Sequence, residues 1–286
     1  MTDPFPHRIV CLTEEPTEVL YALGEQDRIV GISQFTVRPP KARRDKPKVS
    51  GFTSARIEKI INLEPDLVVG FSDIQAEIAR ELIKAGIEVW ISNHRTVEGI
   101  LGYVRRLGAM IGAAPAANAL AAELAEHVDS VAKQAVLLPA RPRVYFEEWD
   151  DPMISGIGWV SEIIEIAGGV DIFADHARSA LARGRIIADP LEVVRRRPDL
   201  LLASWCGKKY QPETVWARPG WDQLDPVQRR RAYEIPGRSA SPLARWTRDG
   251  AVDENREADP EKPKTLAVQG FSIVAGAGFE PATFGL

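Results

Sequence analysis

Two pairs of adjacent acidic residues are the first candidates for chemistry in this sequence. Glu147 and Glu148 are neighbours, and Asp150 and Asp151 follow them near the end of a predicted strand. Two carboxylates can divide the acid and base roles of a reaction when they share one site. Adjacent strand residues point to opposite faces of a sheet, so each pair is divided between two environments. The acidic pairs therefore specify no reaction.

A cysteine nucleophile is the second chemical alternative. Cys206 follows a predicted buried strand, and His94 or His176 could serve as its base. A buried structural thiol is the commoner state of such a cysteine. Cys11 lies far from Cys206 in the chain, and we favour two buried free thiols over a disulfide. The four histidines lack metal-ligand spacing, so we expect no metal site.

Motif searches also favour binding over catalysis. The string at 155–158, SGIG, lacks the lysine and the preceding strand that a phosphate-binding loop needs. The sequence contains no G-x-S-x-G nucleophile motif. We therefore expect no catalytic residues and no covalently bound cofactor, while an α/β enzyme that uses Cys206, His94 or Asp150 stays open as the alternative.

Composition and charge are those of an ordinary soluble protein. The 286 residues are 45% hydrophobic and 27% charged, with a net charge of -4. This acidic balance argues against general nucleic-acid binding. No apolar run approaches the ~20 residues of a membrane span, and the start of the chain, as written, does not have the pattern of a secretory signal.

Two series of alternating strand and helix signals flank one long helix. Residues 113–138 contain no glycine, and Leu120, Leu124 and Val131 recur with helical spacing on one face. Alternation of strands and helices indicates βαβ units with mainly parallel sheets. We predict an α/β protein with a first lobe over 1–112, a connecting helix over 113–140 and a second lobe over 141–237.

The expected elements repeat between the lobes. In the first lobe we expect strands at 8–12, 29–33, 66–70 and 88–92, helices at 13–23, 56–63, 74–85 and 96–111, and a loop over 34–48. In the second we expect strands at 143–148, 199–203 and 232–235, and helices at 160–167 and 190–197. Residues 56–69 resemble 189–202, since both are a short helix, a Pro-Asp pair and a buried strand.

Aromatic residues gather at the predicted strand exits. Residues beyond the carboxyl ends of parallel strands line ligand crevices. Those of the first lobe are Phe35, Phe52 and Phe71, together with Asn93, and those of the second are Trp149, Trp159 and Trp205. Aromatic walls suit a large, flat or apolar ligand, and the tryptophan N–H adds a polar contact. We predict that these seven residues bind the ligand.

The order of several short segments resembles the substrate-binding proteins of ABC importers for cobalamin and iron–siderophore complexes. The matching segments are 8–12, 16–18, 23–24, 29–33, 39–40, 65–68, 167–169 and 198–199. The resemblance covers about residues 7–236 and lies closest to the cobalamin-binding branch.

This resemblance implies two lobes joined by one rigid long helix, with the ligand between them. The implied ligand is cobalamin or another metal–organic chelate, such as heme or an iron–siderophore, none of them held covalently. The implied partner is a membrane permease, docked by Glu77 of the first lobe and Glu192 of the second. A monomer in the periplasm or cell envelope is implied, or in the cytoplasm if the chain has no signal.

The C-terminal segment departs from the resemblance. Residues 238–286 are rich in charge, proline and small residues and show little apolar periodicity. The last residues, GAGFEPATFGL, resemble a peptide encoded where a reading frame crosses the antisense strand of a tRNA gene. We therefore hypothesise a frameshift near residue 237, which would leave the second lobe without its closing helix.

Overall fold

A computed structural model describes residues 4–179, 181–205 and 210–235. The chain divides into two compact units, of which the first ends at Ala125 and the second begins at Glu126. This division falls inside α6 (Ala114–Ala135), which is the predicted long helix. In the described part of the chain, none of the helices combines the length and the apolar character that crossing a membrane requires. The predicted tail at 238–286 lies outside the described residues.

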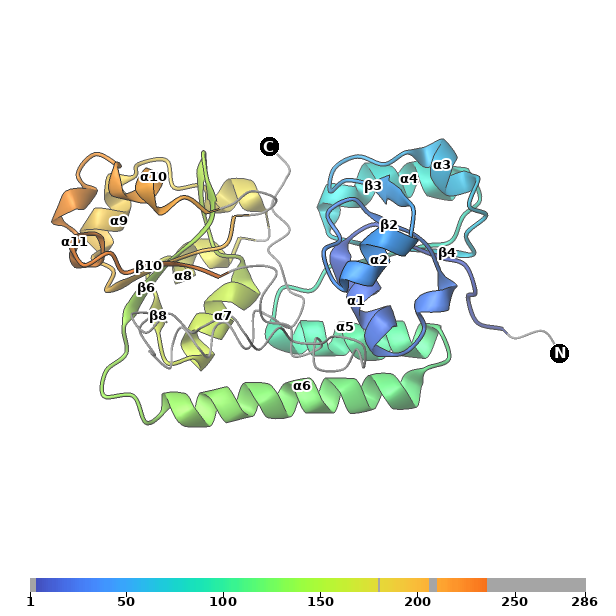
Figure 1. Ribbon diagram of the computed structural model, residues 1–286, viewed down its shortest axis with the longest axis horizontal. Helices are drawn as coiled ribbons and strands as arrows, with labels where there is room; N and C mark the ends of the chain where they lie inside the picture. Colours follow the sequence, from blue (N-terminus) through green and yellow to red (C-terminus); the bar gives the residue numbers. More distant parts are fainter. Residues whose placement is uncertain (1–3, 180, 206–209, 236–286) are drawn as a thin grey trace. The chain divides into compact units, whose positions relative to one another are not determined.

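Unit 1 is built on a parallel sheet, as predicted (Figure 1). Its described strands are β1 (Ile9–Cys11), β2 (Ile29–Ser33), β3 (Lys48–Ser50), β4 (Leu67–Phe71) and β5 (Val89–Ser92). They lie in the order β3-β2-β1-β4-β5, and every pairing is parallel. The carboxyl ends of all these strands therefore share one edge of the sheet.

The helices of unit 1 follow the predicted alternation with one exception. They are α1 (Glu14–Ala22), α2 (Pro40–Asp45), α3 (Ile57–Ile61), α4 (Ala76–Lys84) and α5 (Val97–Met110), with short 3-10 turns η1 (Gln26–Arg28) and η2 (Asp73–Gln75). The predicted loop over 34–48 is wrong, because it contains α2 and ends in β3. Its prolines suggested a loop, but Pro40 occupies the first turn of α2, where proline is tolerated.

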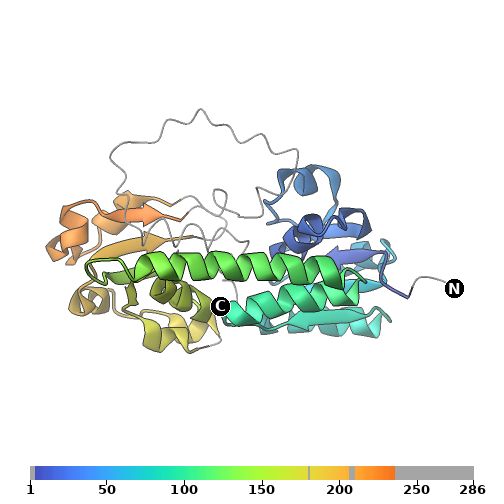
Figure 2. The same cartoon turned by 90° about the horizontal axis from the view of Figure 1, so that it is seen from below.

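Helices α5 and α6 run side by side in Figures 1 and 2. Gly108 of α5 permits this approach, since a Cβ atom there would lie 2.0 Å from the Cβ of Ala117 in α6. Thr96 caps the start of α5, where its side-chain oxygen accepts a hydrogen bond from the Gly99 amide. The N-terminal half of α6 is therefore packed as an integral part of unit 1.

Unit 2 carries a mixed sheet. Its described strands are β6 (Arg143–Asp150), β7 (Met153–Ser155), β8 (Val170–Asp171), β9 (Leu200–Ala203) and β10 (Ala232–Glu234). The order is β10-β9-β6-β7, and β8 also pairs with β6. The β6–β7 pairing is antiparallel, and the other described pairings are parallel. The mainly parallel character that we predicted therefore holds, with a hairpin added at one edge.

Short helices surround the unit 2 sheet. They are α7 (Gly158–Ile166), α8 (Ala174–Ala177), α9 (Leu191–Arg196), α10 (Pro212–Trp216) and α11 (Asp225–Gln228), with 3-10 turns η3 (Ala182–Arg185) and η4 (Trp221–Gln223). Sequence reasoning missed β7, β8, α8, α10 and α11. Each spans at most five residues, which is too short to show a periodic apolar pattern.

The internal repeat has similar hydrogen bonds in both units. In unit 1, Asp66 accepts hydrogen bonds from the backbone N–H of His7 and Arg8, at 2.7 and 2.9 Å. The Arg8 guanidinium in turn donates to the carbonyls of Leu63 and Glu64, just beyond α3.

In unit 2, Asp199 accepts from the Arg143 N–H at 2.8 Å, and the Arg143 guanidinium donates to the carbonyls of Arg196 and Arg197. Glu64 and Arg197, two residues before each aspartate, both have positive φ angles, of 47° and 46°. The two units therefore repeat a local structure as well as a sequence pattern.

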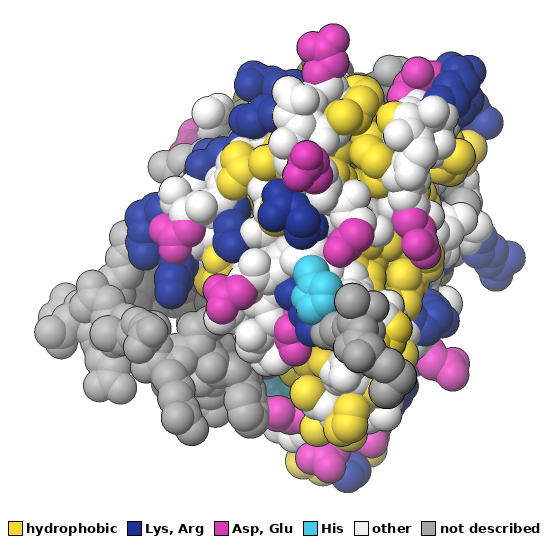
Figure 3. Space-filling model, turned by 90° about the vertical axis from the view of Figure 1, so that its right-hand side faces the viewer, with side chains coloured by type: hydrophobic (Ala, Val, Ile, Leu, Met, Phe, Trp, Pro, Cys, Tyr) yellow, Lys and Arg dark blue, Asp and Glu magenta, His cyan; other side chains and the backbone are white. Residues whose placement is uncertain are grey.

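Each unit has its own apolar core. In unit 1, Val10 and Val68 of adjacent strands pack with Ile60, Ile78 and Leu82 of the covering helices. In unit 2, the core is richer in aromatic residues and includes Tyr145, Phe173, Trp205, Tyr210 and Trp221. On the face drawn in Figure 3, acidic and basic side chains are interspersed, as the small net charge suggests.

Candidate functional site

Two of the predicted phenylalanines form a stacked pair at the carboxyl edge of the unit 1 sheet. Phe35 follows β2 and is half-buried, whereas Phe52 follows β3 and is 7% exposed. Their ring centroids lie 4.5 Å apart, and the ring planes differ by only 9°. Nearly parallel stacked rings of this kind form a flat apolar group.

The third predicted phenylalanine has polar neighbours. Phe71 ends β4, and its ring lies 4.7 Å from the ring of His94. The Arg95 guanidinium carbon lies 4.9 Å from the Phe71 ring centre, a cation–π distance. Asn93 directly follows β5 and is exposed. The four predicted residues of unit 1 thus all follow or end strands of the same sheet.

A residue that sequence reasoning missed holds these strand ends together. Gln75 is fully buried, and its side-chain oxygen accepts from the Phe71 N–H at 2.9 Å. Its Nε2 atom donates to the carbonyls of Leu12 and Phe52, both at 3.3 Å. Gly70 makes room for it, since a Cβ atom there would lie 2.3 Å from the Gln75 oxygen. Gln75 therefore links the ends of β1 and β4 to the segment after β3.

Buried acids at the start of α1 fix the loop that follows β2. Glu14 accepts a hydrogen bond from the Val37 N–H at 3.0 Å, and Glu18 forms an ion pair with Arg38. Both glutamates are buried. The segment that carries Phe35 is thereby attached to α1, and sequence reasoning did not single out either acid.

His94 is a neutral, buried ring rather than a general base. Its Nδ1 atom lies 2.9 Å from the Ser92 hydroxyl. Burial lowers the pKa of His94 to about 4, and the nearby charges of Arg95 and Arg106 add to this effect. A base with so low a pKa is poorly matched to catalysis at neutral pH. This property counts against His94 as the base of a cysteine enzyme.

In unit 2, Trp205 lies two residues beyond β9, as predicted. Its Nε1 atom donates to a carboxylate oxygen of Glu147 at 3.0 Å. The expected polar contact of this indole is therefore made inside the protein. Trp205 is 7% exposed and packs edge-on against Tyr210, with ring centres 4.9 Å apart.

The neighbouring glutamates of β6 face different surroundings, as predicted. Glu147 forms an ion pair with Arg218 at 2.5 Å, whereas Glu148 forms one with Arg185 at 2.6 Å. Glu148 also accepts from the Ile157 N–H at 3.1 Å. Each carboxylate is thus engaged by its own arginine, and the two do not form a shared acid–base site.

The other two predicted tryptophans do not lie at strand exits, and this part of the prediction is wrong. Strand β6 extends to Asp150, so that Trp149 is within the strand, half-buried, with its N–H donated to the Asp151 carbonyl at 2.8 Å. Trp159 lies in the first turn of α7 and is 3% exposed. A role for either in ligand binding stays a prediction.

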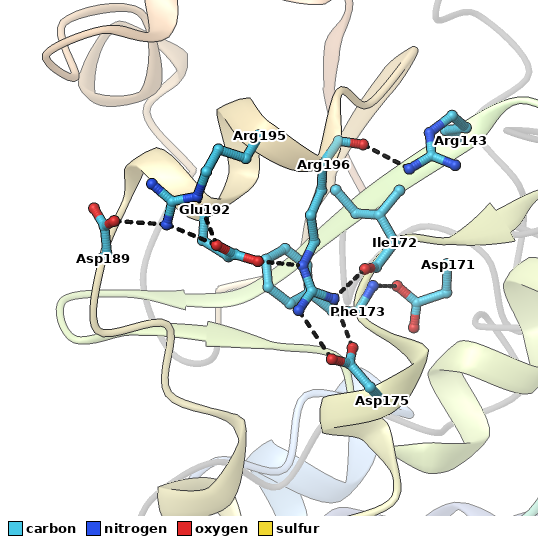
Figure 4. A network of polar contacts seen from close by, with 9 residues as sticks. All are labelled: Arg143, Asp171, Ile172, Phe173, Asp175, Asp189, Glu192, Arg195 and Arg196. Atoms are coloured by element: carbon cyan, nitrogen blue, oxygen red, sulfur yellow. Dashed lines mark hydrogen bonds and ion pairs between the residues drawn. The ribbon is translucent and has the colours of Figure 1, made fainter.

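The two predicted docking glutamates have different surroundings. Glu77 lies in the first turn of α4 with 80% of its side chain exposed, and pairs with Arg80 at 2.7 Å. Glu192 lies in the first turn of α9 and is 32% exposed. Figure 4 shows it between Arg195 and Arg196, at 2.6 and 2.9 Å. Arg196 also bonds Asp175, so Glu192 belongs to a network within unit 2.

The structure describes one of the two cysteines. Cys11 lies in β1 as a buried free thiol, and burial raises its pKa to about 12. Such a thiol is unreactive at neutral pH. Cys206 lies outside the described residues. Among the residues that are described, no histidine, cysteine and acidic side chains gather into a cluster that could hold a metal ion.

These features define a class of protein, namely a two-unit α/β binding protein with aromatic residues at strand ends. The chain belongs to the periplasmic binding protein family, whose model matches residues 9–239. The expected resemblance and the expected fold class are confirmed.

Curated relatives include binding proteins for cobalamin. A cobalamin-binding protein of Halobacterium salinarum is 31% identical over 177 residues, which cover 60% of this chain and 48% of that protein. The chain thus matches about half the length of that relative. A vitamin B12-binding protein of Vibrio campbellii is 26% identical over 200 residues, 69% of this chain and 70% of that protein. An ABC transporter substrate-binding lipoprotein of Bacillus subtilis, YvrC, is 24% identical over 241 residues, 80% of this chain and 73% of that protein.

Solved structures support the fold. The periplasmic heme-binding protein RhuT from Roseiflexus matches with a TM-score of 0.70 at 22% identity, covering 80% of this chain and 88% of that one. The periplasmic vitamin B12-binding protein BtuF of Vibrio cholerae matches with a TM-score of 0.65 at 22% identity, covering 81% and 88%. The relatives are solute-binding proteins rather than enzymes, and this chain shares their family and fold.

Proposed function

We propose that this protein captures a corrinoid such as cobalamin and delivers it to the permease of an ABC importer. The observation that carries the proposal is the set of aromatic side chains at strand ends, above all the stacked pair of Phe35 and Phe52. The cobalamin-binding and vitamin B12-binding relatives support the choice of ligand.

Apolar burial supplies most of the affinity in this proposal. A corrin ring is large and has apolar faces, and buried apolar area contributes roughly 25 cal/mol per Å². Rigid aromatic residues lose little side-chain entropy on binding. Asn93, exposed beyond β5, and Arg95, beside Phe71, supply polar groups that orient the ligand.

The proposed partner is a membrane permease, contacted through Glu77 and Glu192. Carboxylates form strong charge-assisted hydrogen bonds with arginine, and an exposed carboxylate is accessible to the arginines of a partner. Glu77 fits this role by its exposure, whereas Glu192 would exchange its contacts with Arg195 and Arg196 for those of the partner. We propose a monomer that acts in the periplasm or cell envelope.

Titration of the full chain with cyanocobalamin tests the ligand. We expect saturable binding with a sub-micromolar dissociation constant. The binding is measured by calorimetry and by the change in the visible absorbance of the corrinoid. Heme and a ferric siderophore are the comparators, because aromatic walls suit all three. Tighter binding of heme or of the siderophore would assign a different chelate. Failure of all three to bind a cooperatively folded chain would refute a chelate-binding function.

A further inference from the structure

Glu147 is a buried charged residue with a complete set of hydrogen-bond donors. It lies in β6, 1% exposed. Its Oε1 atom accepts from Trp205 Nε1 and from Arg218 Nη2, both at 3.0 Å. Its Oε2 atom accepts from the Tyr145 hydroxyl at 2.8 Å and from Arg218 Nη1 at 2.5 Å. A buried carboxylate needs such donors to offset its lost hydration.

The partners of Glu147 are themselves fixed by the core of unit 2. The Arg218 side chain is 11% exposed, and its guanidinium carbon lies 4.6 Å from the ring centre of Trp221. Trp221 is fully buried, and Tyr145 is 2% exposed. Glu147 is thus held from several sides, and its position is determined before any ligand binds.

This arrangement determines what Trp205 can offer a ligand. The indole has one donor, and that donor is given to Glu147. Tyr210 packs against the same ring at an interplanar angle of 70°. A ligand that reaches Trp205 therefore meets an apolar ring in a fixed orientation. Such a ring stacks on a flat partner and loses little entropy on binding.

We propose that Glu147 is a positioning residue for ligand binding, which holds Trp205 as a stacking surface for a flat macrocycle. The inference rests on the proposed function, since it requires that Trp205 contacts the ligand. Glu147 itself makes no ligand contact in this proposal, and its effect passes through the Trp205 N–H.

Glu148 provides a matched control. It lies on the same strand, is fully buried, and forms an ion pair with Arg185, which is 1% exposed. None of its hydrogen bonds in the described residues involves Trp205. Glutamine at either position leaves a buried arginine without its counter-charge, which destabilises the fold. Both variants are therefore expected to lose folding stability, and only Glu147→Gln also changes the contact to Trp205.

The experiment measures cyanocobalamin affinity and thermal stability of the full chain for Glu147→Gln, Glu148→Gln, Trp205→Phe and the Glu147→Gln/Trp205→Phe double variant. We expect Glu147→Gln to weaken binding by about tenfold and Glu148→Gln by less than about threefold, although both lower the melting temperature. In the Trp205→Phe background, Glu147→Gln should weaken cyanocobalamin binding by less than about threefold, because the hydrogen bond between Trp205 and Glu147 is already lost.

Several outcomes would overturn the inference. Equal losses for Glu147→Gln and Glu148→Gln would show that Glu147 acts only on stability, and an unchanged affinity of Trp205→Phe would show that Trp205 is outside the site. If the glutamine variants do not fold, Glu147→Asp and Glu148→Asp keep the charge and shorten the side chain, and the same inequality is expected. A folded wild-type chain that binds no cyanocobalamin refutes the proposed function instead.

Discussion

The imidazole of His94 is buried beside Phe71 and Tyr103, so its charge state is coupled to folding. Its pKa is about 4 in the folded chain, against an ordinary value of 6.5. Between these values the unfolded chain binds a proton that the folded chain does not. The free energy of unfolding therefore falls as the pH drops from 6.5 toward 4, by up to about 3 kcal/mol.

Urea unfolding across this pH window tests the coupling. The variant His94→Gln lacks the titrating group, so its unfolding free energy should change less steeply with pH than that of the wild type. Direct titration of the ring by NMR should place the pKa near 4. The same pH slope in both proteins, or a ring that titrates near 6.5, would contradict the prediction.

The residues of the candidate site differ in how far the sequence could reveal them. Phe35 and Phe71 could be found because each lies at the end of a predicted strand, which is a local pattern, whereas Phe52 follows β3, a strand that was not predicted. Gln75 could not, because its partners Leu12 and Phe52 are 63 and 23 residues away in the chain. The residues next to a glutamine in the sequence do not indicate that its side chain will be buried against two carbonyls that are distant in the chain.

The same limit applies to Glu147 and Glu148. The period of a strand predicts that they face apart, and the structure confirms this. Their arginine partners, 71 and 37 residues away, depend on how α10, η3 and the loops around them pack, which no local spacing encodes.

At the level of elements, the Pro-Asp repeat allows the contributions of Asp66 and Asp199 to stability to be compared within one chain. Asp66 accepts two backbone N–H groups, whereas Asp199 accepts one. A hydrogen bond to a charged group contributes about 1.5–3 kcal/mol, less where solvent competes, as at these exposed aspartates. We expect Asp66→Ala to destabilise unit 1 by about 1–2 kcal/mol and Asp199→Ala to destabilise unit 2 by less.

Amide hydrogen exchange measures the local stability of each unit separately. Asp66→Ala should accelerate amide exchange in β1 and β4, and Asp199→Ala in β6 and β9. The control is Asp129→Ala, an exposed aspartate of α6 outside both repeats, which should change neither sheet. Exchange that rises equally in both units for one substitution would show that the repeat does not stabilise its own unit.

The sequence predicted long elements better than short ones. Strand β2 and helices α5 and α6 have the predicted type, with bounds within a few residues of those expected. The hairpin strand β7 has only three residues, and because it was missed, β6 was predicted to end at 148, which placed Trp149 at a strand exit. Short elements depend on tertiary pairing, here that of β7 with β6, because three residues carry almost no periodic signal.

For the molecule as a whole, the repeat offers two possible positions for the contact with the proposed permease. Helix α4 follows β4 in unit 1, and α10 follows β9 in unit 2. The counterpart of Glu77 by this order is Glu213, which is exposed in the first turn of α10. Glu192, the residue proposed above, instead lies in α9, which corresponds to α3.

Binding to permease-containing vesicles distinguishes the two assignments. We expect Glu77→Gln and Glu192→Gln each to weaken binding of the cobalamin-loaded chain by about tenfold, because each loses a charge-assisted contact. Corrinoid affinity should be unchanged, since neither residue lies at the strand ends, and Glu213→Gln serves as the control. Loss of docking in Glu213→Gln with none in Glu192→Gln would move the contact to α10. In that case the ion pairs of Glu192 with Arg195 and Arg196 would serve only to hold α9 in unit 2.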